Sequence, residues 1–177
     1  NPGTYAEFVT LPADAVTRKP SKLSFEAAAA LPLSGTVALQ AIRDRGRLQS
    51  GQALLVNGAA GGIGSLAVQL GKALGAVVTG VCSGDSSELV GSLGADEVID
   101  FEKEDLAKLT GTFDVVLDTS GQLTLNGCRN MLRPQGRFIP IVPSARALLD
   151  SVTSRFFGGP RTVPPPLAQP RRADLEL

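Results

Sequence analysis

The sequence predicts a doubly wound α/β fold, in which helices cover both faces of a parallel β-sheet. Three observations lead to this prediction. Short apolar runs rich in β-branched residues recur along the chain, and segments with helical character separate them. One run leads through a glycine-rich turn into an amphipathic helix, which is the first half of a βαβ unit. Strands and helices that alternate in this way form a parallel sheet with right-handed crossovers.

The stretch from Ala53 to Ala76 contains that glycine-rich turn. Residues 53–56 form the continuous apolar run expected of a buried parallel strand. The turn itself reads Gly58-Ala59-Ala60-Gly61-Gly62-Ile63-Gly64. After it, one face of the predicted helix carries Ile63, Leu66, Ala67, Leu70 and Leu74.

The chemistry of this turn suits a phosphate group. Small residues let the backbone approach a pyrophosphate closely, and the free N–H groups and positive dipole end of the helix face the anion. We therefore expect the turn from Ala60 to Gly64 to hold the pyrophosphate of a dinucleotide in a Rossmann fold. The alternative is a tight turn without a ligand, but the flanking strand and helix are the context that favours the motif.

The segment before this stretch has weaker patterns. Residues 5–11 alternate like a half-buried strand, and we expect residues 1–20 to be the end of a preceding unit. Ser24 is expected to cap a short helix over residues 25–31 that Pro32 ends. Residues 35–45 are expected to form a second helix.

Beyond the glycine turn the alternation is regular. Strands are predicted over residues 77–81, 97–99, 113–117 and 137–142. Helices are predicted over residues 86–93, 102–109, 123–132 and 145–157.

The last segment is less regular. Residues 161–168 are either a sixth strand or an extended linker, because Pro164-Pro165-Pro166 cannot donate to a strand ladder. Residues 173–177 resemble a helix cut off after one turn. We expect both ends of the chain to be truncated.

The composition restricts the function. The 177 residues include 17 Lys or Arg, 17 Asp or Glu and no His, so nucleic acid and acidic membranes are not expected partners. No apolar run looks long enough to span a bilayer, and residues 1–10 lack the pattern of a signal peptide. Cys82 and Cys128 are expected to be buried free thiols, and no metal site is predicted. A soluble, cytoplasmic protein is the expectation.

Several motifs together resemble one family. They are 3–9 (GTYAEFV), 27–32 (AAAALP), the glycine turn 58–64, 93–100 (LGADEVID), 113–118 (FDVVLD) and 132–138 (LRPQGRF). In this order they resemble the medium-chain dehydrogenase/reductase superfamily, specifically its zinc-independent quinone oxidoreductase and enoyl reductase branch. The resemblance covers nearly the whole chain. It implies that residues 1–20 end a GroES-like catalytic domain and that residues 21–177 form a Rossmann domain truncated at its C-terminus.

The resemblance also implies roles for residues at the reactive end of the cofactor. Thr119 and Gly121 would lie near the ribose on the nicotinamide side, and Ile141 and Val142 would lie where the family's backbone meets the carboxamide. Val37 would lie beside the nicotinamide, in the place where relatives carry a threonine hydroxyl.

Zinc-dependent relatives keep a cysteine ligand just before the segment that corresponds to residues 35–37. Leu33 and Ser34 occupy that neighbourhood here, which favours zinc independence.

The end of the second strand bears on the choice of cofactor. An NAD enzyme places a carboxylate there to bind the ribose 2′-hydroxyl, whereas this chain has Cys82 followed by Ser83, so NADPH is favoured. Ser86 stands where relatives have a Lys for the 2′-phosphate, and we expect a modest preference. Phe101 replaces a Tyr that packs beside the adenosine in relatives, and it can stack there.

No residue is a convincing general acid, so the catalytic residues are unknown. Tyr5 is the only tyrosine, and its strand pattern favours packing over proton donation. Asp114 and Asp118 flank a predicted strand and are interpreted as turn and sheet-end residues. Val142-Pro143 stands where relatives have small residues, which departs from the family at the reactive end.

The sequence thus predicts an NADPH-dependent, zinc-independent oxidoreductase that transfers hydride to a quinone or an activated C=C bond of a small-molecule substrate. The first alternative is a nucleotide-binding module with little or no catalysis of its own. A third interpretation is an interaction protein that has lost the cofactor. A homodimer formed through the sheet edge is an expectation from the resemblance alone.

Overall fold

The computed structural model describes residues 6–110, 112–154, 159–166, 168, 169 and 171–176. It contains a six-stranded sheet in the order β3-β2-β1-β4-β5-β6, and every neighbouring pair is parallel. This order confirms the predicted doubly wound fold of Rossmann type, and the strand order reverses between β1 and β4. The strands are β1 (Ala53–Asn57), β2 (Val77–Cys82), β3 (Glu97–Asp100), β4 (Phe113–Asp118), β5 (Leu132–Pro140) and β6 (Arg161–Thr162).

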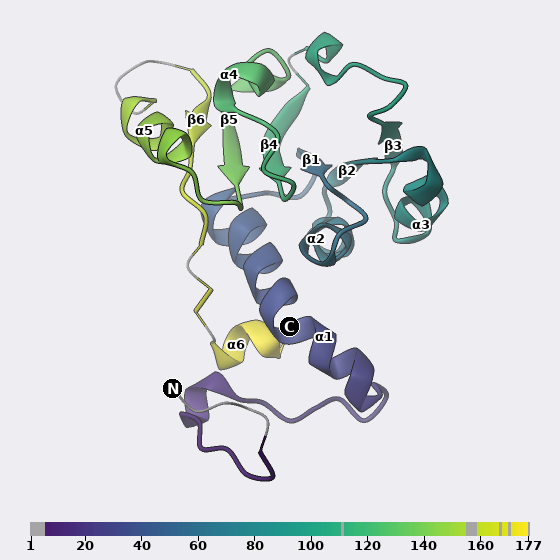
Figure 1. Cartoon of the computed structure of the whole chain (residues 1–177), viewed down its shortest axis with the longest axis vertical. Helices are drawn as coiled ribbons and strands as arrows, with labels where there is room; N and C mark the ends of the chain where they lie inside the picture. The colour runs from purple at the N-terminus through teal and green to yellow at the C-terminus, as the bar shows by residue number, and fades with distance from the viewer. Residues whose placement is uncertain (1–5, 111, 155–158, 167, 170, 177) are drawn as a thin grey trace.

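Helices lie on both faces of the sheet (Figure 1). The longest, α1, leaves the sheet and runs into the lower part of the molecule, where α6 packs beside it. The α-helices are α1 (Phe25–Leu39), α2 (Gly62–Ala73), α3 (Ser87–Ser92), α4 (Leu125–Cys128), α5 (Ala145–Thr153) and α6 (Arg172–Leu175). Shorter turns of 3-10 helix are η1 (Ala13–Ala15), η3 (Gly84–Ser86) and η4 (Leu106–Lys108), and η2 (Gln40–Arg45) is a π-helix.

The core lies on both faces because alternate strand residues point to opposite sides. Leu54 and Val56 of β1 face the cluster formed with α1 and α2. Leu55, between them, faces the second cluster with Phe138 and Met131. Burial on both faces explains the continuous apolar runs of these strands.

The first helix is longer than the sequence predicts. Ser24 caps it as expected, since its Oγ accepts from Ala27 N at 3.1 Å. The helix does not end at Pro32, however, and it continues through that residue to Leu39 and then into η2. The two predicted helices are therefore one, because a proline kinks a helix without always ending it when the next turn is well packed. Residues 36–42 supply that packing, since all are buried.

This helix changes a second expectation. The segment Phe25–Arg45 spans 21 residues, and its most apolar 18-residue window has a mean hydropathy of 1.3, so it is long and apolar enough to cross a membrane by length and composition alone. The expectation of no such run is wrong on this criterion. About a third of its most apolar window is buried inside the fold (33%), and that part packs against α2.

Two predicted helices on the other face are much shorter in the structure. Of residues 102–109 only η4 is helical, and of residues 123–132 only α4 is. The reason is sheet pairing. Met131 O accepts from the N–H groups of Thr112 and Phe113 at 2.9 Å, so the chain already pairs with β4 where a helix was expected. Strand β5 accordingly begins at Leu132, before the turn predicted to precede it.

The C-terminal part of the chain confirms two predicted helices and contains a short sixth strand. Val163 N donates to Phe138 O at 2.8 Å, and three prolines without N–H groups follow, so β6 stops after two residues. Helix α5 confirms the predicted helix as far as Thr153, and residues 155–158 lie outside the described residues. Helix α6 confirms a short helix near the C-terminus.

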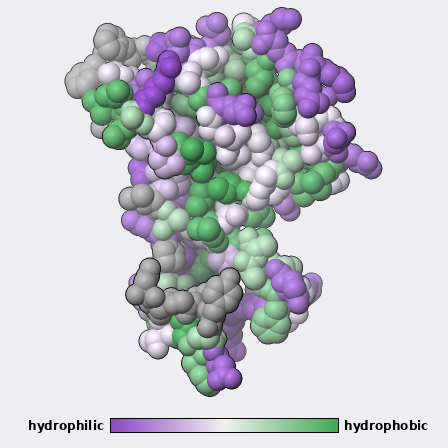
Figure 2. Space-filling model, viewed as in Figure 1, coloured by the Kyte–Doolittle hydropathy of each residue, from purple (hydrophilic) through white to green (hydrophobic). Residues whose placement is uncertain are grey.

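The N-terminal segment is not a strand in the part that the structure describes. Residues 6–11 form no strand, and Tyr5 lies outside the described residues, so the predicted strand is not observed there. Phe8 is 91% exposed and Phe25 80%, which leaves apolar surface on the lower limb of the molecule. Figure 2 shows hydrophobic residues at the surface of this limb.

Candidate dinucleotide-binding site

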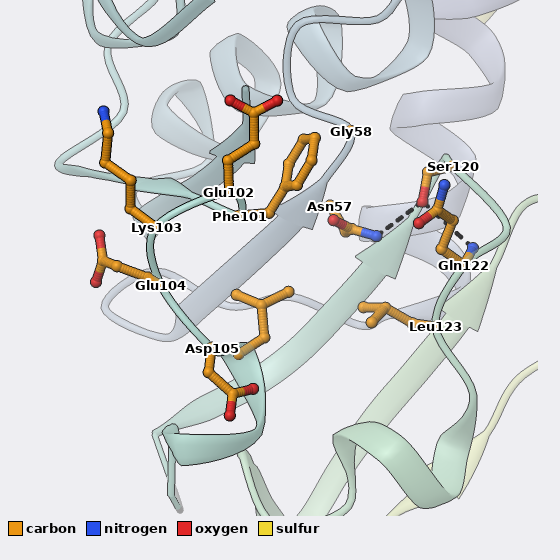
Figure 3. Close-up of a pocket in the computed structure, with 11 residues that line it drawn as sticks. Asn57, Gly58, Phe101, Glu102, Lys103, Glu104, Asp105, Ser120, Gln122 and Leu123 are labelled. Carbon is orange, nitrogen blue, oxygen red and sulfur yellow. Dashed lines mark hydrogen bonds between the residues drawn. The ribbon is translucent and has the colours of Figure 1, made fainter. Parts of the chain in front are cut away.

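The carboxyl ends of β1, β3 and β4 border a cavity of about 600 Å³ (Figure 3). In open α/β sheets this edge, where the strand order reverses, is where ligands bind. The residues that line the cavity are Asn57, Gly58, Phe101, Glu102, Lys103, Glu104, Asp105, Leu106, Ser120, Gln122 and Leu123. Phe101, Leu106 and Leu123 give it an apolar side suited to a planar base.

The glycine turn lies at one end of this cavity and leads into α2. Gly58 has a φ of +81°, and a Cβ at this position would lie 2.5 Å from Thr119 Oγ1. At Gly64 a Cβ would lie 2.1 Å from Gly58 O, so only glycine allows the helix to approach the turn this closely. Gly61 caps α2 without a side chain, and the first N–H groups of the helix remain open to an anion. The geometry fits a pyrophosphate at Ala60–Gly64.

A buried carboxylate organises the neighbouring loop after β4. Asp118 is fully buried, and its Oδ1 accepts from Asn57 Nδ2 at 2.9 Å and from Ser120 Oγ at 2.8 Å. The same atom accepts from the backbone of Ser120 and Gly121, while Oδ2 accepts from Leu123 N at 3.0 Å. Asp118 thus fixes the loop that carries one wall of the cavity. The structure confirms it as a sheet-end residue.

Asp114, at the other end of the same strand, has a structural role too. Its Oδ2 accepts from Ala53 N at 2.9 Å and lies 2.7 Å from Arg133 Nη1. This side chain joins the starts of β1, β4 and β5 on the edge opposite the cavity. Asp114 lies inside β4 and not in a turn, so that part of the interpretation is wrong, although its contacts are structural.

The turn after β2 brings together the residues expected to read the adenosine ribose. Cys82 is the last residue of the strand, and burial raises the pKa of its thiol. Ser83 Oγ lies 3.5 Å from Ser86 Oγ across the 3-10 turn η3. The structure places these three residues together, next to Asp100 at the end of β3, which pairs with Cys82 in the ladder.

Phe101 follows Asp100 and lines the cavity with an exposed ring, 55% accessible. Figure 3 shows this ring across the cavity from Leu123. Stacking of a base between these two side chains agrees with the role expected of Phe101.

The residues expected at the nicotinamide side fall into two groups. Gly121 and Val142 are brought into contact, since a Cβ at Gly121 would lie 3.1 Å from Val142 Cβ. Thr119 donates its hydroxyl to Asn57 O at 2.8 Å, and Ile141 N donates to Asp118 O at 2.8 Å. Val37 does not join them at the cavity and is largely buried on α1, with 9% exposed.

Helix α1 still approaches the glycine turn. A Cβ at Gly62 would lie 3.5 Å from Ser34 Oγ, one turn before Val37. The structure therefore places α1 near the start of α2, but the described contacts do not give Val37 a surface toward the cavity.

Sequence reasoning missed several lining residues. Asn57 and Ser120 join the Asp118 network, and their polar side chains directly after predicted strands were a usable signal. Lys103 was missed because the prediction considered only the end of the second strand, whereas Lys103 follows the neighbouring strand β3. Leu123 was missed because it begins the segment predicted as a helix, and Gln122 directly precedes that segment.

The residues that the structure describes include no group of three or more His, Cys, Asp or Glu side chains arranged to hold a metal ion. The apolar side chains of Phe101, Leu106 and Leu123 instead suit the cavity to a planar base.

Comparisons with known proteins show the family to which the chain belongs. The zinc-binding dehydrogenase family matches residues 62–144. The mitochondrial NAD(P)H oxidoreductase RTN4IP1 of Mus musculus is 43% identical over 138 residues, which cover 74% of this chain and 35% of that protein. The 2-methylene-furan-3-one reductase of Solanum lycopersicum is 43% identical over 122 residues, covering 68% of this chain and 31% of that protein.

A solved structure supports the same assignment. The quinone oxidoreductase of Coxiella burnetii superimposes with a TM-score of 0.76 at 31% identity, over 90% of this chain and 50% of that one. The chain belongs to the medium-chain dehydrogenase/reductase superfamily, among relatives named quinone oxidoreductases and NAD(P)H oxidoreductases. It spans about a third of the length of the first of these relatives and half of the solved structure.

The comparisons overturn the expected cytoplasmic location. The RTN4IP1 relatives from Mus musculus, Homo sapiens and Bos taurus, each 43% identical, are all named mitochondrial. The expectation rested on residues 1–10 and on the cysteine count, and neither distinguishes the cytoplasm from an organelle.

Proposed function

We propose that the chain is the nucleotide-binding domain of a zinc-independent oxidoreductase that uses NADPH to reduce a quinone or an activated C=C bond. One observation carries the proposal: a tight glycine turn, in which Gly64 approaches Gly58 closely, leads into α2 beside a cavity at the strand ends. The relatives named quinone oxidoreductase and 2-methylene-furan-3-one reductase support the two substrate classes. In this proposal residues 1–20 end the catalytic domain and residues 21–177 form the dinucleotide domain.

Each part of the site has a task in this proposal. The N–H groups at the start of α2 bind the pyrophosphate, and Phe101 and Leu123 enclose the adenine. Thr119, Gly121, Ile141 and Val142 form the wall toward the nicotinamide. The bound nicotinamide supplies the hydride, and the protein positions it and excludes water.

Zinc independence is part of the same proposal. The chain has no His, and Ser34 lies near Gly62, in the neighbourhood where zinc-dependent relatives place a cysteine ligand. A hydroxyl group at this position is a poor zinc ligand compared with a thiolate. Reduction of the substrate then relies on hydride transfer without Lewis-acid activation by this domain.

Calorimetric titration of the chain with NADPH and with NADH tests the proposal. Binding of NADPH in the micromolar range, clearly tighter than NADH, is the expected result. Tighter NADH binding would reverse the cofactor assignment while keeping the oxidoreductase class. If neither nucleotide bound, the third interpretation, an interaction protein without cofactor, would replace the proposal.

A second candidate function is a nucleotide-binding module with little catalysis of its own. One observation favours it: Val142 crowds Gly121 at the expected nicotinamide side. Turnover of a naphthoquinone with NADPH separates the two candidates. Nucleotide binding without turnover by the chain would favour the module.

A homodimer belongs to the proposal only as an expectation of the family. The sheet edge at β6 is two residues long and is followed by prolines, which restricts continuous strand pairing there. Sedimentation equilibrium would measure the oligomeric state directly.

A further inference from the structure

Lys103 is a cation held against the turn that follows β2. Its Nζ lies 2.8 Å from Asp100 Oδ2. A Cβ at Gly84 would lie 2.7 Å from that oxygen and 3.4 Å from Lys103 Nζ, so the ion pair rests directly against the backbone of the turn. Asp100 ends β3 and is the ladder partner of Cys82, the last residue of β2. Because the two strand ends are adjacent, Lys103 in the loop after β3 reaches the turn after β2.

Within this ion pair, the exposed charge is the ammonium of Lys103 and not the carboxylate of Asp100. The side chain of Lys103 is 78% exposed, whereas that of Asp100 is 11% exposed. Asp100 Oδ1 accepts from Glu102 N at 3.1 Å, and Oδ2 is buried without a directed hydrogen bond, although Lys103 lies within ion-pair distance. The ammonium holds the pKa of Asp100 below its usual range, and Asp100 raises the pKa of Lys103, so both groups are charged at neutral pH.

The position of this cation matches one part of a dinucleotide. In a Rossmann domain the adenosine ribose lies at the end of the second strand, and its 2′ oxygen distinguishes NAD from NADP. Ser83 and Gly84 form that strand end here, and Phe101, next to Asp100, lines the cavity for the base. Figure 3 shows Lys103 on the side of the cavity away from Gln122 and Leu123.

We propose that Lys103 binds the adenosine 2′-phosphate of NADPH and determines the preference for NADPH over NADH, with Asp100 as its positioning residue. The inference rests on the proposed function and names the residue that supplies the charge absent at Ser86. Three exposed carboxylates oppose the phosphate: Glu102 and Glu104 on the same loop as Lys103, and Asp85 in the turn η3 itself. The preference is therefore moderate, about tenfold, because a single charge-assisted contact at an exposed site is partly screened.

Titration calorimetry on the Lys103→Gln variant tests the assignment. NADPH affinity is expected to fall about tenfold, whereas NADH affinity changes less than twofold. The matched control is Lys108→Gln, which removes the same charge five residues further along, in η4, from a residue that does not line the cavity. It should leave both affinities unchanged.

Salt dependence separates a direct contact from a structural role. In the wild-type chain, the ratio of NADPH to NADH affinity should fall as KCl is raised, since an ionic contact is screened. In Lys103→Gln the ratio should be nearly independent of salt. Gly84→Ala, whose methyl group displaces the ion pair, should lower the same ratio without removing a charge.

The outcomes distinguish this inference from the function on which it rests. Equal losses of NADPH and NADH affinity in Lys103→Gln, or no loss, would overturn the inference and leave the proposed function in place. If the wild-type chain bound neither nucleotide, the proposed function and the inference would both be overturned.

Discussion

Asn57 Nδ2 donates to Asp118 Oδ1 at 2.9 Å, which joins the ends of β1 and β4 at the point where the strand order reverses. Both residues are buried, and Ser120 Oγ lies 2.8 Å from Asn57 Nδ2 as well. This cluster is polar but fully connected, so its cost of burial is offset by hydrogen bonds. It holds the loop between Gly121 and Leu123 against the cavity.

Replacement of Asp118 by Ala is expected to be severely destabilising. The backbone N–H groups of Ser120, Gly121 and Leu123 would lose their acceptor, together with the buried Asn57 Nδ2. We expect a loss of about 3–5 kcal/mol in the free energy of unfolding, measured by urea denaturation. The control is Glu88→Ala, an exposed acidic residue on α3, which should change stability by less than about 0.5 kcal/mol. Similar stability of the two variants would contradict the role assigned to Asp118.

Gly64→Ala should abolish nucleotide binding. The added methyl group would lie 2.1 Å from Gly58 O, and the turn must open to accommodate it. NADPH and NADH affinities should both fall at least tenfold, because the pyrophosphate contact is common to the two nucleotides. This shared loss differs from the NADPH-specific loss expected of Lys103→Gln.

The control for that experiment is Gly91→Ala in α3. A Cβ at Gly91 has nothing within 4 Å, and alanine is favoured over glycine inside a helix. This variant should bind both nucleotides normally and gain up to about 1 kcal/mol in stability. Normal binding by Gly64→Ala would remove the glycine turn from the site.

Asp174→Ala should detach the C-terminal segment from α1. Asp174 Oδ1 lies 2.7 Å from Arg43 Nη2, and Oδ2 accepts from Gln40 Nε2 at 2.8 Å, with the carboxylate side chain only 3% exposed. Limited proteolysis should cut near residues 168–176 faster in this variant. The control Glu176→Ala removes only an exposed pair with Arg172, so its cleavage rate should match that of the wild type. Equal rates in both variants would mean that Asp174 does not anchor α6.

Opposing effects act on the pKa of Asp174. Burial raises the pKa, but the hydrogen bonds from Gln40 and Arg43 and the charge of Arg43 together lower it by more, so the net pKa lies below the ordinary 3.8. A depressed folded pKa contributes stability above pH 3.8 that is lost as the pH falls through the folded value. The protection of α6 against proteolysis should therefore weaken only below about pH 4.

The parts of the fold that were predictable are those with local causes. The strand at Ala53, the turn and α2 follow from an apolar run, close-packed glycines and helical periodicity within one continuous segment. Ser24 likewise caps its helix with its own side chain. The length of α1 was not predictable in this way, because the burial of residues 36–42 against α2 maintains the helix beyond Pro32.

The residues of the candidate site likewise fall into those predictable from local sequence and those that depend on strand pairing. The glycine turn and Phe101 could be found from neighbours in sequence. The ion pair of Asp100 and Lys103 could not be found in this way. The pairing of β2 with β3 places it against Gly84, which is distant from it in the sequence. Similarly, the pairing of Met131 O with Thr112 and Phe113 replaces the end of the predicted helix, and this pairing involves residues far from 123–132 in the sequence.

Cys128 should make the stability of the chain fall steeply at alkaline pH. Its side chain is fully buried between α4 and the sheet, with Sγ 3.0 Å from Thr124 O, and burial raises the pKa of the thiol to about 12. The ordinary value is 9.0, so the stability present below pH 9 is lost as the pH rises toward the folded pKa. Each pH unit in this window costs about 1.4 kcal/mol, because the unfolded state releases the proton and the folded state does not.

The measurement compares urea denaturation of the wild type and of Cys128→Ser between pH 8 and 11. Serine keeps a donor for Thr124 O but does not titrate in this range, so its stability should decline less steeply. Other groups that titrate above pH 9 are common to both proteins, and the difference between the two profiles therefore isolates Cys128. Parallel profiles would show that the thiol ionises as readily in the folded chain as in the unfolded one, and that its buried position does not resist the charge.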